Sequence, residues 1–472
     1  MKTKTTFKTL AIALGLTLAS VAQASTTALP KDLPAYGPEK PLPIPQIAQR
    51  TLPNGLTVWV VPRDGLPKID VALAVLGGTA ADDAATPALS QLMAGLLDEG
   101  TASRDSRSIA EALQAIGGDY RASADDDAVN IRASALSSHA SQLLELVADT
   151  ALHPSFPANE VTLAKANALQ SLKVQEADPD WEAQRAFGHA AYGEHPYARD
   201  SLNEASVAAA SPERLKALHD TRFRPDRALL VIVGRIGADE AFKLAEQQFG
   251  GWKASGEALA DTAPAPRTAA PQRLIVPREG AVQSNIRYGR PAVPASDPDY
   301  IPLTVANTIL GGGFTSRITQ DIREDKGYSY SPWSRFSANR AGGSTVATVD
   351  VRNEVTGATL AELAKLYGSM ASQPASAEEL TGAKRLVGGI YLLRNQIQGS
   401  LTATLANYWV DGLPPTFLGS YVAEANKVTA DQVQAMGRKY FAAKDQSIVI
   451  VGDPKAIDAQ LKPYGDFTVF KP

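Results

Sequence analysis

The sequence of 472 residues contains no cysteine, which excludes disulfides, thiolate metal sites and cysteine nucleophiles. It also lacks an excess of charge, because 46 basic residues stand against 50 acidic residues and the net charge is -4. No basic run follows the amino terminus, so a nucleic-acid partner is not indicated. Apolar residues make up 44% of the chain, which is typical of a soluble globular protein with a substantial core.

Long hydrophobic runs are absent except near the amino terminus. Three lysines in the first eight residues precede an apolar run at residues 10–16, and Ala22-Gln23-Ala24 follows it. This is the pattern of a secretory signal peptide, so residues 1–24 are expected to be cleaved and the mature protein is expected in the periplasm. No later stretch approaches the ~20 apolar residues that a membrane-spanning helix requires.

Familiar local motifs for catalysis are missing as well. The few histidines never stand at the H-x-x-x-H spacing that places two metal ligands on one helical face; they are His139, His153, His189, His195 and His219. No G-x-S-x-G elbow supports a serine hydrolase. The three glycines from Gly311 to Gly313 are followed by Phe-Thr rather than Lys-Ser/Thr, so the phosphate-loop pattern also fails.

The order of elements repeats along the chain. A helix, a buried strand ending in glycine and another helix occur around Gly234 and again around Gly452, 218 positions later. We therefore expect an α+β protein of two tandem homologous domains, each a mostly antiparallel sheet flanked by helices. The expected segments are a Pro-rich extended stretch at 25–46, a first domain at 47–255, a Pro/Ala-rich linker at 256–272 and a second domain at 273–472.

Individual elements follow from periodicity and turn residues. Asn54-Gly55 between two β-rich runs predicts a hairpin, and residues 69–76 predict a further strand. Apolar residues at helical spacing predict helices at 84–97, 108–116, 137–152, 157–175, 180–192, 211–222, 238–250, 429–440 and 454–464.

The stretch from Gly311 to Tyr330 combines a glycine turn with charged and aromatic residues. An apolar helix ends at the glycines, which are expected to adopt positive φ. Thr315 or Ser316 is a plausible N-cap for a second short helix, which Gly327 would end. The side chain of Arg323 would project from the last turn of this helix.

A strand is then expected to begin near Tyr328. Tyr330 would share one face of it with Tyr328, since side chains alternate along a strand. The Arg323 guanidinium and a phenol could therefore converge on one point. Taken alone, each feature has a structural explanation: a glycine run is often only a loop, and a tyrosine in a strand is often core.

Several short segments together resemble the pitrilysin/insulinase/mitochondrial processing peptidase family of zinc peptidases. They extend over nearly all of the mature chain and are L-P-N-G-L-T at 52–57, L-D-E-G-T at 97–101, G-E-H-P-Y at 193–197, F-R-P at 223–225, V-I-V-G at 231–234, and the glycine loop with its Ser-Arg-Ile and Arg-Tyr spacing. The resemblance implies paired α+β domains that close around a peptide.

The sequence departs from this family at the metal site. Active members carry H-x-x-E-H where residues 91–95 read Gln-Leu-Met-Ala-Gly, and a downstream glutamate ligand where residues 170–172 read Gln-Ser-Leu. The residues at the ligand and general-base positions, Gln91, Ala94, Gly95 and Ser171, cannot replace two imidazoles and two carboxylates. No zinc is therefore expected in this chain.

The resemblance assigns roles to the second half. Arg323 and Tyr330 match the Arg-Tyr pair that holds the substrate and the developing oxyanion, and Gly311, Gly312, Gly313 and Phe314 match a substrate-binding glycine loop. The implied protein is a non-zinc subunit that pairs with an H-x-x-E-H subunit carrying zinc and cleaves peptides only in that heterodimer. The alternative is a catalytically inert binding or structural protein of the same fold. An autonomous peptidase with a relocated metal site lacks visible ligands.

Overall fold

The computed structural model describes residues 44–199 and 201–471, and Ile44–Pro472 forms one compact unit. The expected signal peptide at 1–24 lies outside the described residues, as does most of the Pro-rich segment. Within the described part, no helix is long and apolar enough to cross a membrane.

Strands of the first half of the chain build one six-stranded sheet, in the order β1-β2-β6-β3-β5-β4. The strands are β1 Ala48–Thr51, β2 Thr57–Pro62, β3 Lys68–Leu76, β4 Asp119–Ala124, β5 Ala128–Leu136 and β6 Ala228–Gly234. The predicted hairpin is present: β1 pairs with β2, and Gly55 between them has a φ of 96°, which glycine adopts without strain. Only β2 and β6 run parallel; the other pairs are antiparallel.

The second half builds another six-stranded sheet, in the order β12-β7-β11-β8-β10-β9. Its strands are β7 Arg273–Pro277, β8 Gln283–Ala292, β9 Trp333–Ala338, β10 Gly343–Arg352, β11 Ser447–Gly452 and β12 Thr468–Val469. From the second position onward, this order and its pairing directions repeat those of the first sheet. Gly234 and Gly452 end corresponding strands, so the duplication read from the sequence exists in the topology.

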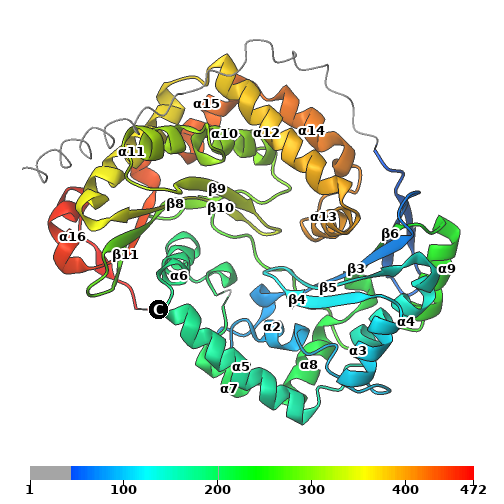
Figure 1. The fold of residues 1–472 in the computed structure, drawn as a ribbon. Coiled ribbons are helices and arrows are strands. Elements are labelled where there is room, and N and C mark those ends of the chain that lie inside the picture. The colour runs from blue at the N-terminus through cyan, green and yellow to red at the C-terminus, as the bar shows by residue number, and fades with distance from the viewer. Residues whose placement is uncertain (1–43, 200, 472) are drawn as a thin grey trace, which may run out of the picture. The chain divides into compact units, whose positions relative to one another are not determined.

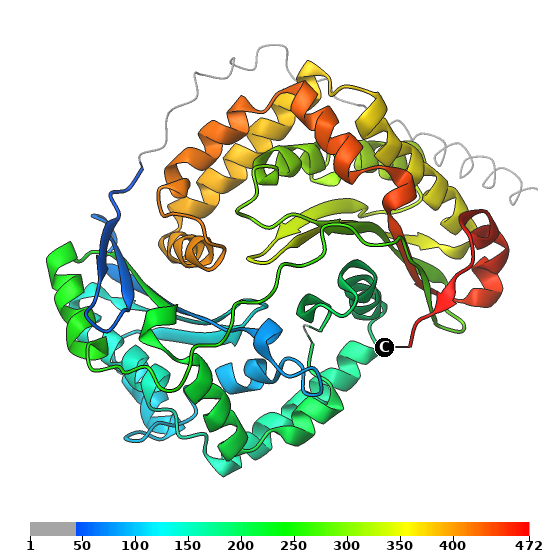
Figure 2. The same ribbon diagram turned by 180° about the vertical axis from the view of Figure 1, so that it is seen from behind.

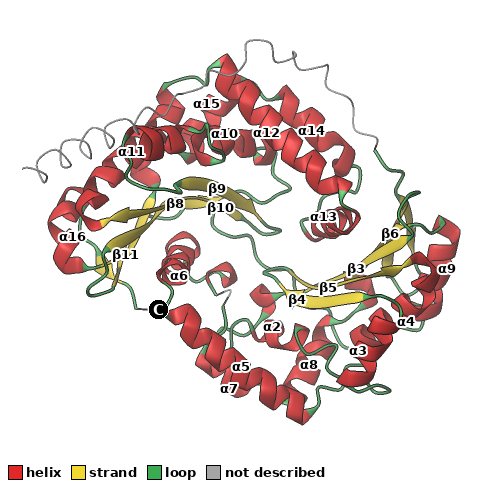
Figure 3. Cartoon of the chain, in the orientation of Figure 1, coloured by secondary structure: helices red, strands yellow, loops and turns green. Residues whose placement is uncertain are grey.

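Helices cover the sheets (Figure 1; Figure 3). Those before the linker are α2 Leu89–Ala94, α3 Ser106–Ala115, α4 Ala140–Leu152, α5 Ala158–Glu176, α6 Pro179–Tyr192, α7 Glu204–Ala209, α8 Pro212–Arg222 and α9 Ala238–Phe249. Those after it are α10 Tyr300–Gly311, α11 Thr356–Ser372, α12 Ala377–Gln396, α13 Gln398–Val410, α14 Phe417–Lys427, α15 Ala430–Tyr440 and α16 Pro454–Leu461. Short 3-10 helices occur at 79–81, 137–139, 196–198, 225–227, 353–355, 443–445 and 462–464.

Two helices are exchanged between the halves. The apolar side of α6, including Phe187, packs on Val346 and Val449 of the second sheet. In return, α13 packs Leu401 and Leu405 on the first sheet. Both views show each helix against the sheet of the other half (Figure 1; Figure 2). Each sheet therefore has one face completed by a helix from the other half of the chain.

Polar anchors fix the exchanged helices at their amino-terminal ends. The buried Arg287 of β8 forms an ion pair with Asp180 of α6. At the start of α13, the Gln398 amide donates to Asp70 of β3 at 2.7 Å. Asp180 and Gln398 are 218 positions apart, the same separation as Gly234 and Gly452, so the exchange follows the duplication.

The two halves also meet at the hairpin turns β4–β5 and β9–β10. The Tyr197 hydroxyl donates to the carboxylate of Asp127 at 2.7 Å and accepts from the N–H of Ala341 at 2.9 Å. Asp127 additionally accepts from the backbone N–H of Arg340 at 3.0 Å. Burial raises the pKa of the Asp127 carboxyl, although Tyr197 and Arg340 oppose that shift.

The predicted helix at 84–97 is much shorter in the structure. Only α2 is helical, and Ala88 before it adopts a left-handed φ of 55°. Asp82 explains the local geometry, because it accepts hydrogen bonds from the backbone and hydroxyl of Ser90 and forms a buried 2.6 Å ion pair with Arg222. These contacts hold the chain in turns before α2, where the apolar spacing alone indicates a helix.

Candidate functional site

The glycine run begins inside α10 and does not adopt the expected positive φ. Gly311 is the last residue of the helix, and Gly312 caps it with a φ of -87°. Space is the constraint: a Cβ on Gly311 would lie 2.5 Å from the Cβ of Ser334, and one on Gly312 would lie 2.7 Å from the Cα of Thr308. On Gly313 it would lie 2.7 Å from Cδ2 of Leu386. Glycine is therefore required here for close packing.

A π-helix, Thr319–Asp325, follows the loop in place of the expected α-helix. Ile322 of this helix and Ile318, the residue before it, are fully buried. The Ser316 hydroxyl accepts a long, 3.5 Å hydrogen bond from the N–H of Thr319, so it is a weak cap at best. Short π-helical segments are frequently found at functional sites.

Arg317 anchors the loop to α12. Its Nε and Nη2 atoms donate to the two carboxylate oxygens of Glu379 at 2.7 and 3.1 Å, and Nη1 donates to the Ser369 hydroxyl at 3.0 Å. A bidentate pair of this geometry is stronger than a single hydrogen bond. Arg317 is therefore a structural residue that fixes the glycine loop against its neighbour.

Gly327 ends the π-helix as predicted, with a left-handed φ of 62° and an N–H that bonds to the carbonyl of Arg323. The strand expected from Tyr328 is not present, because β9 begins only at Trp333. Tyr328 packs against the core, whereas Tyr330 is 81% exposed, so the two tyrosines do not share a face. The N–H of Tyr328 is already used by the carbonyl of Ile322.

Arg323 and Tyr330 nevertheless come together. The Arg323 guanidinium carbon lies 4.9 Å from the ring centroid of Tyr330 and 5.6 Å from that of Phe314. These are cation–π distances, and they bring the guanidinium to two exposed aromatic rings. Glu324 lies beside it, with Oε1 3.2 Å from Nε of Arg323.

A cavity of about 390 Å³ opens next to this cluster. It is lined by Gly311, Gly312, Gly313, Phe314, Thr319, Arg323, Ser331, Pro332, Trp333, Ser334 and Arg335. The structure thus brings the whole predicted glycine loop and Arg323 to one cavity, with Tyr330 stacked near Arg323 at its edge. Trp333 and Arg335 were not predicted from the sequence; the alternation in Trp-Ser-Arg-Phe was the available signal.

The positions of the expected metal helix do not fit zinc. Ala94 and Gly95 carry no ligand atom, and Gly95 is exposed at the end of α2. Ser171 is exposed on α5. Among the described residues, no group of three or more His, Asp or Glu side chains could hold a metal ion. Gln91 stands on α2, and its amide is a poor replacement for imidazole.

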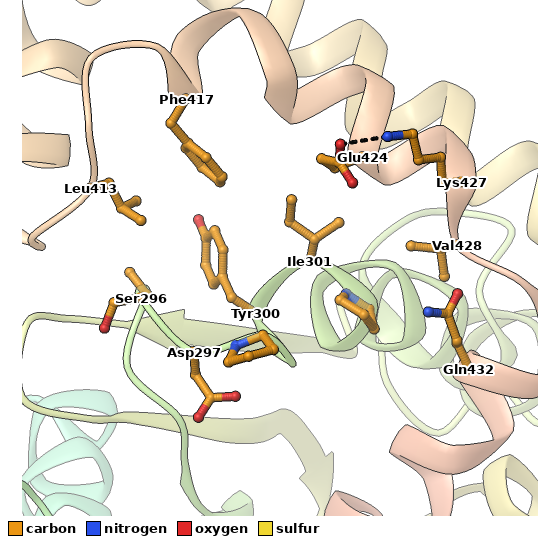
Figure 4. A pocket seen from close by; sticks show the side chains of 13 residues that line it. Ser296, Asp297, Tyr300, Ile301, Leu413, Phe417, Glu424, Lys427, Val428 and Gln432 are labelled. Atoms are coloured by element: carbon orange, nitrogen blue, oxygen red, sulfur yellow. Dashed lines mark hydrogen bonds and ion pairs between the residues drawn. The ribbon is translucent and has the colours of Figure 1, made fainter.

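Another cavity, of about 280 Å³, lies between α10 and α14 (Figure 4). Tyr300 and Phe417 lie at one end of it, and Glu424 forms a 2.7 Å ion pair with Lys427 at the other. Asp297, also in its wall, already accepts from Arg267. The charged groups of this cavity thus have partners within the chain, which favours the glycine-loop cavity as the functional site.

Comparison with protein families gives two adjacent matches. Residues 60–205 match the family described as insulinase (peptidase family M16), and residues 209–387 match the peptidase M16 inactive domain. Together the two regions span more than half of the chain.

Similar proteins are known from several bacteria. The uncharacterized zinc protease YmxG of Bacillus subtilis is 25% identical over 86% of this chain and 98% of its own. The uncharacterized zinc protease Rv2782c of Mycobacterium tuberculosis is 23% identical over 91% of this chain and 99% of its own. The protein named non-peptidase homolog YmxG of Helicobacter pylori is 22% identical over 83% of this chain and 90% of its own.

Solved structures show the same fold. A peptidase M16 inactive domain from Pseudomonas fluorescens has a TM-score of 0.80 and 25% identity, covering 86% of this chain and 98% of its own. A Helicobacter pylori protease also has a TM-score of 0.80, at 17% identity, covering 87% of this chain and all of its own.

Proposed function

The chain belongs to the insulinase family, peptidase family M16, and we propose that it is the non-zinc subunit of a heterodimeric zinc peptidase. One contrast carries the proposal. The glycine loop, Phe314 and Arg323 line one open cavity and Tyr330 lies against Arg323, whereas the expected metal-ligand positions of the same chain carry no imidazole or carboxylate. A partner subunit with an intact H-x-x-E-H motif would supply the zinc.

In this proposal the chain binds and orients the peptide. The partner's zinc would activate the water that attacks the peptide carbonyl. Arg323 provides a fixed positive charge; its Nε contacts Glu324, and its two terminal nitrogens are available to a carbonyl or oxyanion. The exposed hydroxyl of Tyr330 provides a second donor. Phe314, 79% exposed, offers an apolar surface for a substrate side chain.

The chain alone is expected to have no peptidase activity. The match to an inactive domain and the name of the Helicobacter pylori relative agree with that expectation. They also fit the second candidate, a catalytically inert binding or structural protein of the same fold. The exposure of Phe314 and Tyr330 near an open cavity argues against the purely structural form of the second candidate, because a structural protein gains no stability from exposed aromatic rings.

We place this heterodimer in the periplasm. The basis is the leader-like pattern of residues 1–24, with its lysines, apolar run and small-residue cleavage site. Absence of cysteine is compatible with an oxidising compartment, since no thiol is exposed to unwanted pairing.

Reconstitution tests the proposal. The chain is co-expressed with an H-x-x-E-H homologue from the same genome, and cleavage of unfolded peptides is measured for each chain alone and for the complex. We expect activity only in the complex, with kcat lowered about tenfold to a thousandfold by Arg323→Ala and less by Tyr330→Phe. Arg352→Gln, at an exposed position on β10 outside the cavity, is the control.

Two results would refute this assignment. An active complex that is insensitive to both substitutions would remove Arg323 and Tyr330 from the site. Stoichiometric zinc in the purified chain alone, measured by elemental analysis, would show that the metal site lies in this subunit after all.

A further inference from the structure

Trp333 and Arg335 form an exposed face on a sheet edge. β9 is the last strand of the second sheet and pairs only with β10 among the described strands. Its alternate residues face α10: Ser334 donates to the side chain of Asn307 at 2.7 Å, and the ring of Phe336 lies 5.9 Å from that of Tyr300. Because side chains alternate, Trp333 and Arg335 point to the opposite face.

The charge at the cavity has one sign. Among the described residues, Arg323 and Arg335 are the charged side chains in its lining. Arg335 is exposed and has no ion pair among the described residues, whereas Arg323 contacts only the exposed Glu324 and the two aromatic rings. An unpaired guanidinium beside apolar surface is suited to a ligand carboxylate, since Arg binds carboxylates through two parallel hydrogen bonds.

Apolar surface continues from the cavity along α12. The side chain of Leu386 lies next to Gly313, and Ile390, Leu393 and Ile397 follow at spacings of four, seven and eleven residues. The last three are 53%, 67% and 64% exposed. At 1.5 Å per residue this face is roughly 16 Å long, which about five residues of an extended peptide would span.

The outer edge of β9 adds a backbone template, although the carbonyl of Ser334 already accepts a hydrogen bond from Nδ2 of Asn307 at 3.0 Å. A strand at a sheet edge leaves N–H and C=O groups free, and extended peptides bind such edges by adding a strand, with side-chain pockets giving the specificity. The cavity beside β9 supplies such a pocket, walled by Phe314 and Trp333.

We propose that this surface selects extended peptides in which an acidic residue lies two positions from a large apolar residue, so that both side chains point to the same face of the peptide. The apolar side chain packs against Phe314 and Trp333, and the carboxylate binds Arg335 with help from Arg323. This inference rests on the proposed function, because it names the substrate class of the same site. It makes Arg335 and Trp333 specificity-determining residues.

Binding to the purified chain without a partner tests the inference. Fluorescently labelled nine-residue peptides with one central Phe are compared by fluorescence anisotropy, with Glu, Gln or Lys two positions from the Phe. We expect the Glu peptide to bind about tenfold more tightly than the Gln peptide, and the Lys peptide more weakly still. Arg335→Gln should abolish the preference for Glu over Gln, Arg335→Lys should retain part of it, and Arg352→Gln should leave it intact.

The apolar contact has its own variant. Trp333→Ala should weaken binding of the Phe peptide. A peptide with Ala in place of Phe should bind the wild type and Trp333→Ala equally weakly. Circular dichroism and the unfolding midpoint establish that each variant remains folded.

Each contrary result has a separate meaning. Equal binding of the three peptides, tighter binding of the Lys peptide or no binding at all would overturn the substrate class, while the proposed function would still stand if the reconstituted heterodimer cleaves peptides. If Arg335→Gln instead weakens association with the H-x-x-E-H subunit and leaves peptide selection unchanged, this surface contacts the partner and the inference is wrong.

Discussion

Asp411 offers a test of how the two halves are held together. It caps the carboxyl-terminal end of α13, near the contact between the β4–β5 and β9–β10 turns. Burial raises the pKa of its carboxyl to about 8, and the neighbouring carboxylates of Asp127 and Asp125 add to the shift, while Arg340 opposes it. At neutral pH the folded protein therefore keeps a proton on Asp411 that the unfolded chain has lost.

The sign of the pH dependence follows from proton binding. Between pH 4 and pH 8 the folded state binds one more proton at Asp411 than the unfolded state, so this group lowers the free energy of unfolding as the pH rises. The slope is about 1.4 kcal/mol per pH unit. It disappears above the folded pKa, where both states are ionised. Asp411→Asn, which mimics the protonated carboxyl, removes this loss.

The experiment compares urea unfolding of wild type and Asp411→Asn at pH 6 and pH 9. From pH 6 to pH 9 the free energy of unfolding of the variant should rise by about 2–3 kcal/mol relative to that of wild type. The reason is that the wild type loses stability at Asp411 until the pH passes the folded pKa. Asp431→Asn, at an exposed position on α15, is the control and should show no such gain. A constant difference between wild type and Asp411→Asn at both pH values would refute the reasoning.

Two further substitutions test packing. Phe187→Ala on α6 should lower the free energy of unfolding by about 3–5 kcal/mol, because this fully buried ring joins α6 to the second sheet. The control Leu169→Ala on α5, where the side chain is partly exposed, should lower it far less. Similar losses in the two variants would contradict the packing of α6 on the second sheet. Gly311→Ala should lower the free energy of unfolding by about 1–3 kcal/mol, because the new Cβ clashes with Ser334. The control Gly368→Ala in α11 places its Cβ where no atom lies within 4 Å and should be neutral or stabilising. Equal urea midpoints of the two variants would show that the loop relaxes without loss of stability.

Local patterns predicted many of the helices and some of the strands. The Asn54-Gly55 hairpin and the strands at Gly234 and Gly452 are present because turn residues and β-branched runs act over short distances. The duplication was also visible, since strand order follows from the order of such elements. The resemblance to the insulinase family is confirmed by the family matches.

Contacts between distant residues account for what the sequence did not reveal. An amphipathic pattern indicates that α6 and α13 each bury one side, but it does not identify the sheet against which that side packs. The shortening of α2 depends on Asp82 and Arg222, 140 residues apart. The glycine run was interpreted through backbone freedom, although the constraint on Gly311 is the close approach of Ser334 on β9.

The edge strand that carries Trp333 was placed too early for a related reason. The N–H of Tyr328 bonds back to the carbonyl of Ile322, so the chain is still closing the π-helix where the alternating residues suggested a strand. Pro332 then precedes β9 and has no N–H to offer to a ladder. The functional consequence is that Tyr330 lies in an exposed loop beside Arg323 and not in a sheet.

The two halves of the chain differ in what their structure maintains. The expected metal positions of the first half include Ala94 and Gly95, which have no polar side-chain atom. The second half instead restrains its loop through the bidentate Arg317–Glu379 pair and a packed glycine, yet leaves Phe314 79% exposed. Burial of a phenylalanine is worth about 1.5–3 kcal/mol, so a scaffold optimised for stability would bury this ring. A rigid loop that presents an exposed ring next to an arginine is suited to binding another molecule, and this argument favours a binding role for the second half.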